Sequence, residues 1–480
     1  MAGSKSWPAA KTSAAQASAA PILQTLAAFF ETRLLSGSRL CVGLSGGVDS
    51  VVLLHALDCL RRSGLQVDLS AVHVDHALSS NAAAWAAFCV DFCRRLQVPL
   101  EIHRVEVPRA SGEGLEAAAR RVRHAAFAAC RAEWLALAHH RDDQAETVLF
   151  RLLRGAGVAG AAGMPAERPQ PRGPRLIRPL LDVSRSLILR YAEMHSLAWI
   201  EDESNADCHY RRNHLRREVM PRIAVHFPGA AQALARAARH FSEATELLDE
   251  LAQADRAALI GECGRIDLAR FNALSPARAR NLLRSELLAS GFRAPEARWL
   301  DEALRQLKTA AAASQTCIAT VDGEVHTYRG KLYIFAHCPA LGNLAVSWNG
   351  ELRLPWGDGW VSFVRRSGKG VSRRLLAAAP VFLRVRQGGE RLRPDARRPA
   401  RTLRKLLQEA AVPPWERARL PLLCCGERLA WVAGLGVDAA FACAAGEEGV
   451  ELLWERGDGQ APAGFALSGK PAACIGQATG

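Results

Sequence analysis

A short glycine-rich stretch, Leu44-Ser45-Gly46-Gly47-Val48-Asp49-Ser50, carries the residue types best suited to chemistry in this chain. An apolar run precedes it and residues 51–57, also apolar, follow it, so we expect a strand, a loop and a helix in direct succession. Gly46 and Gly47 allow positive φ and a close approach to an anion, while the helix start directs unpaired N–H groups at that anion. The stretch is therefore predicted to bind phosphate. The alternative is a tight turn in which Ser45 or Asp49 only caps the helix.

The side chains of this loop indicate how the phosphates are used. No lysine follows the second glycine, whereas a Walker A loop has one for the β and γ phosphates, so we expect pyrophosphate to be the leaving group. Ser45 and Ser50 add hydroxyl donors. Asp49 would repel phosphates unless it holds a cation, so we assign it to a Mg²⁺ that bridges the pyrophosphate oxygens. The loop thus predicts ATP and Mg²⁺ as cofactors and adenylation of a substrate.

Residues 137–147 form a second motif, which enters a predicted helix. Asp143 and Glu146 are three residues apart and so lie on one helical face, where two carboxylates could hold an ammonium group. One of them could accept a proton as that amine becomes a nucleophile. The alternative is a pair of ordinary first-turn acids that complement the helix dipole. His139 either contacts a nucleotide or is packed at the end of a strand.

Two further positions are expected near the phosphates. Glu116 and Arg120 lie four residues apart on the preceding predicted helix. They either form an exposed ion pair, or Arg120 points to the strand ends and neutralises the α-phosphate. His73 lies at the end of another apolar run, in the segment His73-Val-Asp-His76, and we expect it to contact the nucleotide.

The pattern around these motifs predicts an α/β fold. Apolar runs at residues 68–74, 100–107 and 134–139 alternate with helical patterns such as residues 115–131, which indicates a doubly wound parallel sheet. Ligands of such sheets bind beyond the carboxyl ends of the strands, and the two motifs and His73 fall at those ends.

Length and composition set the remaining limits. The 480 residues suggest several domains, and 62 Lys and Arg against 48 Asp and Glu, a net charge of +14, favour a polyanionic partner. The 13 cysteines are scattered without a CxxC pair, which fits reduced cytoplasmic thiols and lacks the usual zinc or iron–sulfur spacing. No apolar run is long enough to cross a bilayer, so we expect no membrane association.

Changes in composition divide the chain into six parts. We expect a disordered tail (1–20), a catalytic domain with the phosphate loop (21–226), a helical domain (227–313), a β-rich connecting part (314–379), a mixed α+β C-terminal domain (380–456) and a second disordered tail (457–480). Basic residues gather in residues 211–222 and 391–405, where they either bind a polyanion or form a solvated face.

The motifs together resemble those of the tRNA(Ile)-lysidine synthetases, a family of the PP-loop ATP pyrophosphatases. The resemblance covers residues 40–223 and returns in residues 388–423. It rests on the following segments: Ser45–Ser50, His73–His76, Glu116 with Ala119-Arg120, Ala138-His-His with Asp143-Gln-Ala-Glu-Thr147, Arg154-Gly-Ala-Gly157, Arg178-Pro-Leu-Leu181, Asp202-Glu-Ser-Asn205 ahead of Arg212-Asn213, Gly388-Gly-Glu-Arg-Leu-Arg-Pro394, Leu403–Glu409, Pro413-Pro-Trp-Glu-Arg417 and Pro421-Leu-Leu423.

This resemblance implies a specific ligation. The C2 oxygen of the wobble cytidine of an isoleucine tRNA with a CAU anticodon would attack the α-phosphate of ATP, and the ε-amine of L-lysine would then displace AMP from C2. Asp143 and Glu146 would bind lysine, Arg120 would stabilise the α-phosphate, and Arg212 with Asn213 would orient the substrate or the tRNA. The helical domain (227–313) would bind the substrate or the tRNA, and the C-terminal domain (380–456) would bind the tRNA. The oligomeric state stays open, with a homodimer as one option.

The chain departs from the family pattern at Ala77-Leu78-Ser79-Ser80, where an arginine is usual, and at His124, where a tyrosine is usual. These departures concern tRNA or substrate contacts and leave the phosphate loop intact. A tRNA thiolase, a small-molecule amidating synthetase and an RNA-binding module without chemistry are the competing interpretations. The absence of paired cysteines weighs against the thiolase, and the lack of a glutaminase domain weighs against the amidating synthetase. The intact carboxylates weigh against a module without chemistry.

Overall fold

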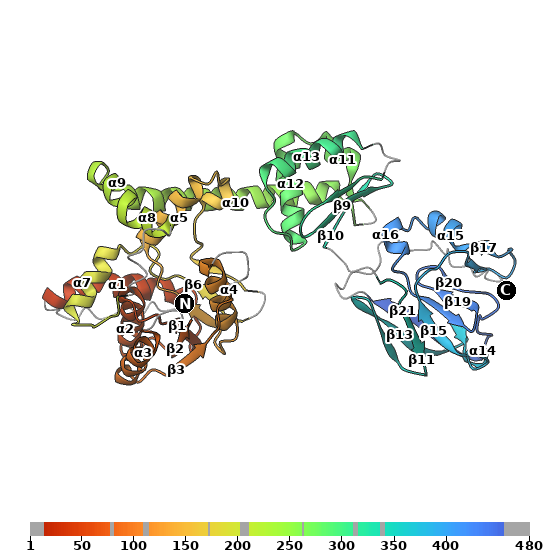
Figure 1. Cartoon of the computed structure of the whole chain (residues 1–480), viewed down its shortest axis with the longest axis horizontal. Helices are drawn as coiled ribbons and strands as arrows, with labels where there is room; N and C mark the ends of the chain where they lie inside the picture. The colour runs from red at the N-terminus through yellow and green to blue at the C-terminus, as the bar shows by residue number, and fades with distance from the viewer. Residues whose placement is uncertain are drawn as a thin grey trace, which may run out of the picture. The chain divides into compact units, whose positions relative to one another are not determined.

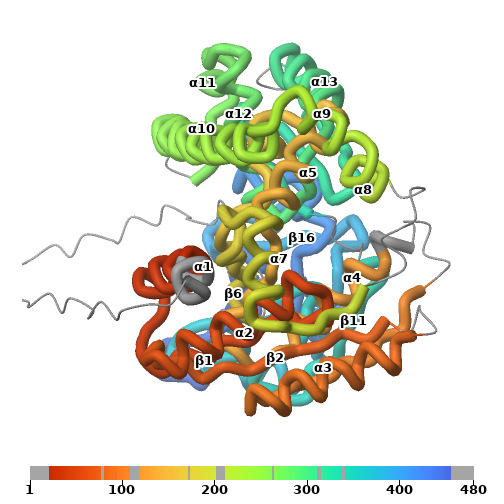
Figure 2. Tube along the Cα trace, turned by 90° about the vertical axis from the view of Figure 1, so that its left-hand side faces the viewer, coloured from red at the N-terminus to blue at the C-terminus, as the bar shows by residue number. Residues whose placement is uncertain are grey.

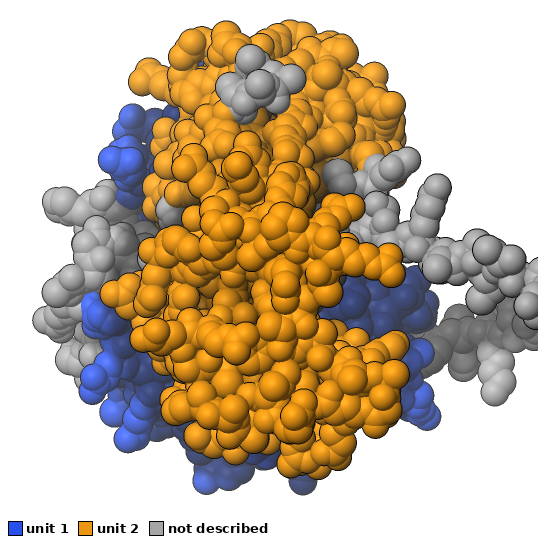
Figure 3. Space-filling view, turned by 90° about the vertical axis from the view of Figure 1, so that its right-hand side faces the viewer, with its two compact units in different colours: residues 1–247 blue, residues 248–480 orange. Residues whose placement is uncertain are grey.

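The computed structural model describes residues 14–76, 81–108, 115–170, 173–201, 211–261, 264–310, 315–336 and 341–455. It divides into two compact units, Met1–Leu247 and Leu248–Gly480, which Figure 3 colours separately. From the change of composition near Phe227, we expected this boundary about twenty residues earlier in the chain. The helix α10 (Ala230–Leu259) begins just after the expected boundary and runs through the observed one. No helix of the described part is long and apolar enough to span a membrane.

Unit 1 is built on a six-stranded sheet with the order β3-β2-β1-β4-β6-β5. Its parallel strands are β1 (Ser38–Gly43), β2 (Val67–Asp75), β3 (Leu100–Arg104), β4 (Trp134–Ala136) and β6 (Arg175–Ile177). The short strand β5 (Glu167–Arg168) pairs antiparallel with β6 at the edge. The predicted parallel α/β sheet is therefore confirmed.

Helices cover both faces of this sheet, with α2 (Val48–Arg62) and α3 (Ala82–Leu96) on one side and α4 (Leu115–Ala128) on the other (Figure 1). Side chains of a strand alternate between faces, and β1 follows this rule: Leu40 and Val42 pack in the core beneath α2, whereas Cys41 packs in the smaller core with Phe127 of α4. The apolar run of β1 therefore reflects burial on both faces.

The first core is completed by α1 (Ala14–Glu31) and α7 (Arg185–Met194), which lie beside α2 (Figure 2). The helix α1 begins at Ala14, inside the stretch for which a disordered tail was expected. Its residues Ile22, Leu26 and Phe30 recur every four positions and are fully buried, which explains why this segment forms a helix against the domain.

The remaining elements of unit 1 follow β4 in the chain. They are α5 (Arg141–Leu152), α6 (Val158–Ala161), α8 (Arg211–His214), the π-helix η2 (Leu215–Val219), α9 (Met220–His226) and the first part of α10. Since β1 lies between β2 and β4, the strand order reverses at β1, and the loops after β1 and β4 flank the crevice where ligands of doubly wound sheets bind.

Unit 2 begins with an α+β part. The helices α11 (Leu268–Ala273), α12 (Pro276–Ala289) and α13 (Ala297–Thr309) bury Leu282, Leu300 and Leu307 against an antiparallel sheet of order β7-β10-β9-β8. The strands are β7 (Ile266–Asp267), β8 (Cys317–Ala319), β9 (Gly323–Tyr328) and β10 (Lys331–Ala336).

The C-terminal part of unit 2 has two larger antiparallel sheets and a two-stranded one around a single core. The first contains β11 (Ala345–Trp348), β15 (Val381–Arg384), β18 (Leu422–Cys425), β19 (Arg428–Val432) and β20 (Gly436–Val437). The second contains β12 (Arg353–Trp356), β13 (Gly359–Ser367), β14 (Val371–Ser372) and β21 (Glu448–Glu455). The strands β16 (Arg391–Leu392) and β17 (Arg401–Thr402) pair with each other, and α14 (Arg373–Leu376), α15 (Leu403–Glu409) and α16 (Pro414–Arg417) are short helices.

Candidate active site

The glycine-rich loop joins β1 to α2, as its sequence predicts. Gly46 has φ +89°, and a Cβ on it would lie 2.6 Å from Cδ1 of Ile200, so this position excludes other residues for two reasons. Its carbonyl accepts a hydrogen bond from the N–H of Ile200 at 2.9 Å. The expectation of positive φ was wrong for Gly47, which is extended at φ −70° and stands at the N-cap of α2. Only the first glycine makes the turn.

The hydroxyls of the loop bind the loop itself. Ser50 is buried; its Oγ donates to the carbonyl oxygen of Gly47 at 2.9 Å and accepts from the N–H of Ser45 at 3.2 Å. The Oγ atoms of Ser45 and Ser50 lie 3.1 Å apart. Ser50 therefore fixes the loop's shape, while the exposed Ser45 remains the better placed hydroxyl for an incoming phosphate.

His140 connects this loop to the second motif. As N-cap of α5 it accepts the N–H of Asp143 on Nδ1 at 3.3 Å, and its own N–H donates to Asp143 Oδ2 at 3.1 Å, which makes a reciprocal capping box. With Nδ1 accepting, the other ring nitrogen, Nε2, is the donor, and it lies 3.7 Å from Asp49 Oδ1 and 3.4 Å from Asp143 Oδ2. The starts of α2 and α5 thus meet at one imidazole.

Asp49 has the properties expected of a cation ligand. Its Oδ1 is buried and accepts no hydrogen bond from the described part of the chain. Burial raises the pKa of Asp49, which His140 opposes and the carboxylate of Asp143 increases further. A divalent ion beside the loop would relieve both penalties, so the residues present fit Mg²⁺.

Asp143 and Glu146 share one face of α5, as predicted, and both are buried. They hold an arginine that the sequence did not single out for this site. Nη2 of Arg216, on η2, lies 2.6 Å from Asp143 Oδ1 and 2.9 Å from Glu146 Oε2, and its Nε lies 2.7 Å from Glu146 Oε1. Arg212 approaches the same carboxylates at 3.9 and 3.7 Å.

These charges determine how Asp143 ionises. Burial alone would raise the pKa of Asp143, but His140 and Arg216 hold it below its usual value. The two carboxylates in turn raise the pKa of Arg216 against the effect of its burial. A buried ion pair of this kind is strongly coupled, and removing one partner leaves an uncompensated charge.

The two other predicted histidines differ in their surroundings. His73 is buried, and its Nδ1 hydrogen-bonds the carbonyl oxygen of Leu44 at 2.8 Å, so it supports the strand end just before the phosphate loop. Burial lowers the pKa of His139 to about 3, and its Nδ1 is buried without a hydrogen-bond partner in the described residues. His139 is therefore neutral at physiological pH and has an unused polar atom.

Arg120 is exposed on α4, and its charge acts on a group of arginines. The pKa of Arg178 is lowered to about 10, first by its burial and then by the charges of Arg168, Arg120 and Arg151. Burial, Arg120 and Arg212 likewise lower the pKa of Arg151. These arginines therefore concentrate positive charge in this part of the domain. Asn213 is half-buried beside Arg212 on α8. The side chain of Glu116 and the segments Ala77–Ser80 and Asp202–Asn205 lie outside the described residues.

His140 and Arg216 are the site residues that sequence reasoning missed. No role of its own was expected for His140 from the sequence, although its place three residues before Asp143 at a helix start indicates a cap. Arg216 was included only in the basic segment 211–222. Its spacing of four residues from Arg212 already places both on one helical face, and that signal could have assigned it to the carboxylates.

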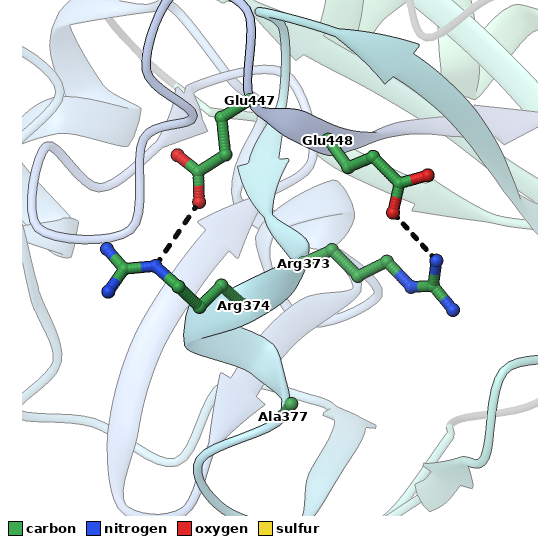
Figure 4. A pocket seen from close by; sticks show the side chains of 5 residues that line it. All are labelled: Arg373, Arg374, Ala377, Glu447 and Glu448. Carbon is green, nitrogen blue, oxygen red and sulfur yellow. Dashed lines mark hydrogen bonds and ion pairs between the residues drawn. The ribbon is translucent and has the colours of Figure 1, made fainter.

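A surface hollow in unit 2 shows the opposite arrangement of charges. It encloses about 380 Å³ and is lined by Arg373, Arg374, Ala377, Glu447 and Glu448. Figure 4 shows its two arginines turned to its two glutamates, at 2.8 Å for Arg373 with Glu448 and 3.7 Å for Arg374 with Glu447. Its charges are satisfied within the hollow, so it does not compete with the sheet edge as an anion site.

Comparison with known proteins agrees with the geometry. Residues 19–223 match the family described as "PP-loop domain", residues 266–333 the "TilS substrate binding domain" and residues 381–454 the "TilS substrate C-terminal domain". Proteins named tRNA(Ile)-lysidine synthase from Nitrosomonas europaea, Aromatoleum aromaticum and Coxiella burnetii are 43%, 46% and 36% identical to the chain. Each alignment covers 87% of this chain, and 92%, 97% and 93% of the respective relatives.

Proposed function

The chain belongs to the tRNA(Ile)-lysidine synthase family, and we propose that the carboxyl edge of its parallel sheet performs both steps of lysidine formation. The enzyme is an ATP-dependent ligase that modifies tRNA. The C2 oxygen of the wobble cytidine of the CAU-anticodon isoleucine tRNA attacks the α-phosphate and pyrophosphate leaves; the ε-amine of L-lysine then attacks C2 and AMP leaves. One observation carries the assignment to this edge: His140 lies within 3.7 Å of Asp49 and 3.4 Å of Asp143, so the phosphate loop and the carboxylate pair face one crevice.

The phosphate loop receives the pyrophosphate part of ATP. Its N–H groups at the start of α2, a helix of 15 residues, supply fixed positive dipoles, and the turn at Gly46 brings the backbone close to the phosphates. Asp49 would hold Mg²⁺ through its buried Oδ1, and the ion would neutralise charge on the leaving pyrophosphate. His73 supports the loop from behind, and neutral His139 contacts the nucleotide through its unused ring nitrogen.

Arginines supply the positive charge that stabilises the α-phosphate during adenylation. We assign Arg120 to the α-phosphate, and its electrostatic effect on Arg151 and Arg178 supports a common anion site. Arg212 and Asn213, at the start of α8, orient the cytidine or the tRNA. No side chain needs to form a covalent bond, because positioning and charge stabilisation suffice for both steps.

Asp143 and Glu146 bind the lysine ammonium group. Nη2 of Arg216 bridges the two carboxylates at 2.6 and 2.9 Å, which is the position an ammonium nitrogen would take. The two cations therefore exclude each other, and lysine enters by displacing the guanidinium of Arg216. One of the carboxylates then accepts the proton that the amine loses as it attacks C2.

The tRNA is bound in part by the basic segment 391–405 of unit 2. Arg397, Arg404 and Lys405 are exposed there, next to the β16–β17 pair, and are suited to phosphate contacts. A cytoplasmic location, where tRNA, ATP and lysine are all present, fits this activity.

The decisive assay follows labelled lysine into tRNA and pyrophosphate release in the same reaction. Wild type should release pyrophosphate with ATP and tRNA and incorporate lysine only when all three substrates are present. Asp143→Asn and Glu146→Gln should keep pyrophosphate release and lose lysine incorporation by about 100-fold or more, since each leaves a buried charge unpaired. Asp142→Asn is the matched control, because Asp142 adjoins Asp143 on α5 but bonds the N–H of Arg185. If both variants keep the wild-type KM and kcat for lysine, the lysine site lies elsewhere.

A further inference from the structure

Three metal-binding side chains share one face of the small sheet in unit 2. Cys317 of β8 is paired directly with His326 of β9, and Glu324 stands two residues before His326. Side chains alternate along a strand, so Glu324 and His326 point to the same face, and directly paired residues such as Cys317 and His326 are neighbours on it. A cysteine, a carboxylate and an imidazole are thus brought together by strand pairing, at a spacing that no linear sequence motif shows.

The atoms that could bind a metal converge on one ring nitrogen. Nε2 of His326 lies 3.5 Å from Sγ of Cys317 and 2.7 Å from Oε2 of Glu324, and the three ligand atoms all lie within 4.8 Å of one another. Tetrahedral zinc with bonds of about 2.3 Å to sulfur and about 2.0 Å to nitrogen separates those two ligands by about 3.5 Å. The observed sulfur–nitrogen distance equals that edge. The nitrogen–oxygen edge of the same tetrahedron is about half an ångström longer than the observed 2.7 Å between His326 Nε2 and Glu324 Oε2. The Glu324 carboxylate would have to move by that amount, which is easy for a side chain that is 34% exposed.

Aromatic side chains hold the imidazole in place. The ring of His326 stacks on Phe335 of β10 with centroids 5.0 Å apart and an interplanar angle of 15°. Its other neighbour is Trp415 of α16, with centroids 4.3 Å apart. Trp415 also contacts Tyr328 and Tyr333 of the same sheet. A fixed ring orientation and an apolar surround favour metal binding, because less freedom is lost when the ligands close on the ion.

We propose that Cys317, Glu324 and His326 form a binding site for zinc, with water as the fourth ligand. Binding converts the Cys317 thiol to a thiolate and releases its proton to solvent. The ion would join β8 to β9 and fix His326 against Trp415, so that it stabilises the contact between this sheet and α16. The mechanism proposed above uses none of these residues, so either proposal could hold without the other.

Cobalt spectroscopy tests the site on the full chain after exhaustive chelation. Titration with Co²⁺ should give one equivalent of tightly bound ion, an intense near-ultraviolet thiolate-to-cobalt band and tetrahedral bands in the visible, all displaced by Zn²⁺. Cys317→Ser should abolish the thiolate band. His326→Gln should weaken binding by more than about 100-fold, beyond the loss expected for a residue that only supports a ligand.

Two substitutions serve as matched controls. Cys443→Ser removes a half-buried thiol of the same unit, whose Sγ bonds the carbonyl oxygen of Glu447, and His240→Gln removes an exposed histidine beside Glu243. Both should leave the titration unchanged. In the wild type, Zn²⁺ should slow alkylation of Cys317, located by peptide mapping, and leave that of Cys443 unaffected. A Co²⁺ spectrum without a thiolate band, or a thiolate band that persists in Cys317→Ser, would overturn the site; neither result bears on lysine transfer.

Discussion

The displacement of Arg216 by lysine predicts opposite effects of one substitution at high and low pH. In the wild type the pKa of Asp143 lies below its ordinary value, so Asp143 stays ionised and lysine affinity should vary little between pH 5 and 8. Arg216→Gln removes the guanidinium that competes with lysine, so lysine should bind more tightly at pH 8. The same change leaves two adjacent carboxylates without their cation, so their pKa rises, and lysine affinity should fall as the pH drops through it.

The size of both effects follows from the geometry. Two unit charges about 4 Å apart at an effective dielectric constant near 20 interact by about 4 kcal/mol, which corresponds to about three pKa units. The Arg216 side chain is 30% exposed, so solvent screens part of this interaction, and we expect the rise in carboxylate pKa to be smaller than that figure. At pH 8 the gain should be about tenfold in Kd, since a hydrogen bond to a charged group contributes a net stabilisation of about 1.5 kcal/mol or more.

Equilibrium dialysis with labelled lysine measures Kd without depending on catalysis. The curves of Kd against pH for wild type and Arg216→Gln should cross between pH 5 and 8. Arg216→Lys keeps the charge and should follow the wild type. Arg94→Gln removes an exposed arginine paired with Asp91 on α3 and controls for net charge. Weaker lysine binding by Arg216→Gln at every pH, parallel to the wild-type curve, would refute the displacement and make the guanidinium part of the lysine site.

Three further outcomes are expected. Gly46→Ala should lower the free energy of unfolding by about 2–4 kcal/mol, because it combines an unfavourable φ with a 2.6 Å approach to Ile200, whereas Gly47→Ala, with its nearest contact at 3.5 Å, should change it by less than about 1 kcal/mol in chemical denaturation. Asp49→Asn should raise the Mg²⁺ concentration needed for half-maximal pyrophosphate release at least tenfold, and an unchanged Mg²⁺ dependence would remove Asp49 from the metal site. The logarithm of tRNA affinity should fall steeply with the logarithm of salt concentration, and Arg404→Gln should reduce that slope by about one.

Local patterns were enough to predict the framework of the active site. Apolar runs interrupted by helical periodicity predicted the parallel sheet, and the double glycine predicted the turn from β1 into α2. The spacing of Asp143 and Glu146 placed both on one face of α5, and both proved to be buried together. Each of these features depends on residues within about twenty positions of one another, where periodicity and backbone preference carry the information.

Contacts between distant segments were beyond the sequence patterns. Arg216 reaches Glu146 across 70 positions, and Ile200 restricts Gly46 across more than 150. Nothing in the local composition of residues 211–222 distinguishes an arginine that binds carboxylates from one that faces solvent. The positive φ expected at Gly47 failed for a related reason, because a single left-handed residue completes the turn and the second glycine can stay extended.

The charges at the sheet edge are arranged so that each substrate meets groups of the opposite charge. The phosphate loop presents backbone N–H groups at the start of α2, so the end that we assign to ATP offers positive dipoles. The amine end has two buried carboxylates whose charge Arg216 already balances. Asp49 stands between them as the acid whose Oδ1 accepts no hydrogen bond from the described residues. Because exchanging Arg216 for an ammonium group leaves the net charge unchanged, lysine can enter without disturbing the electrostatics on which ATP binding and Mg²⁺ depend.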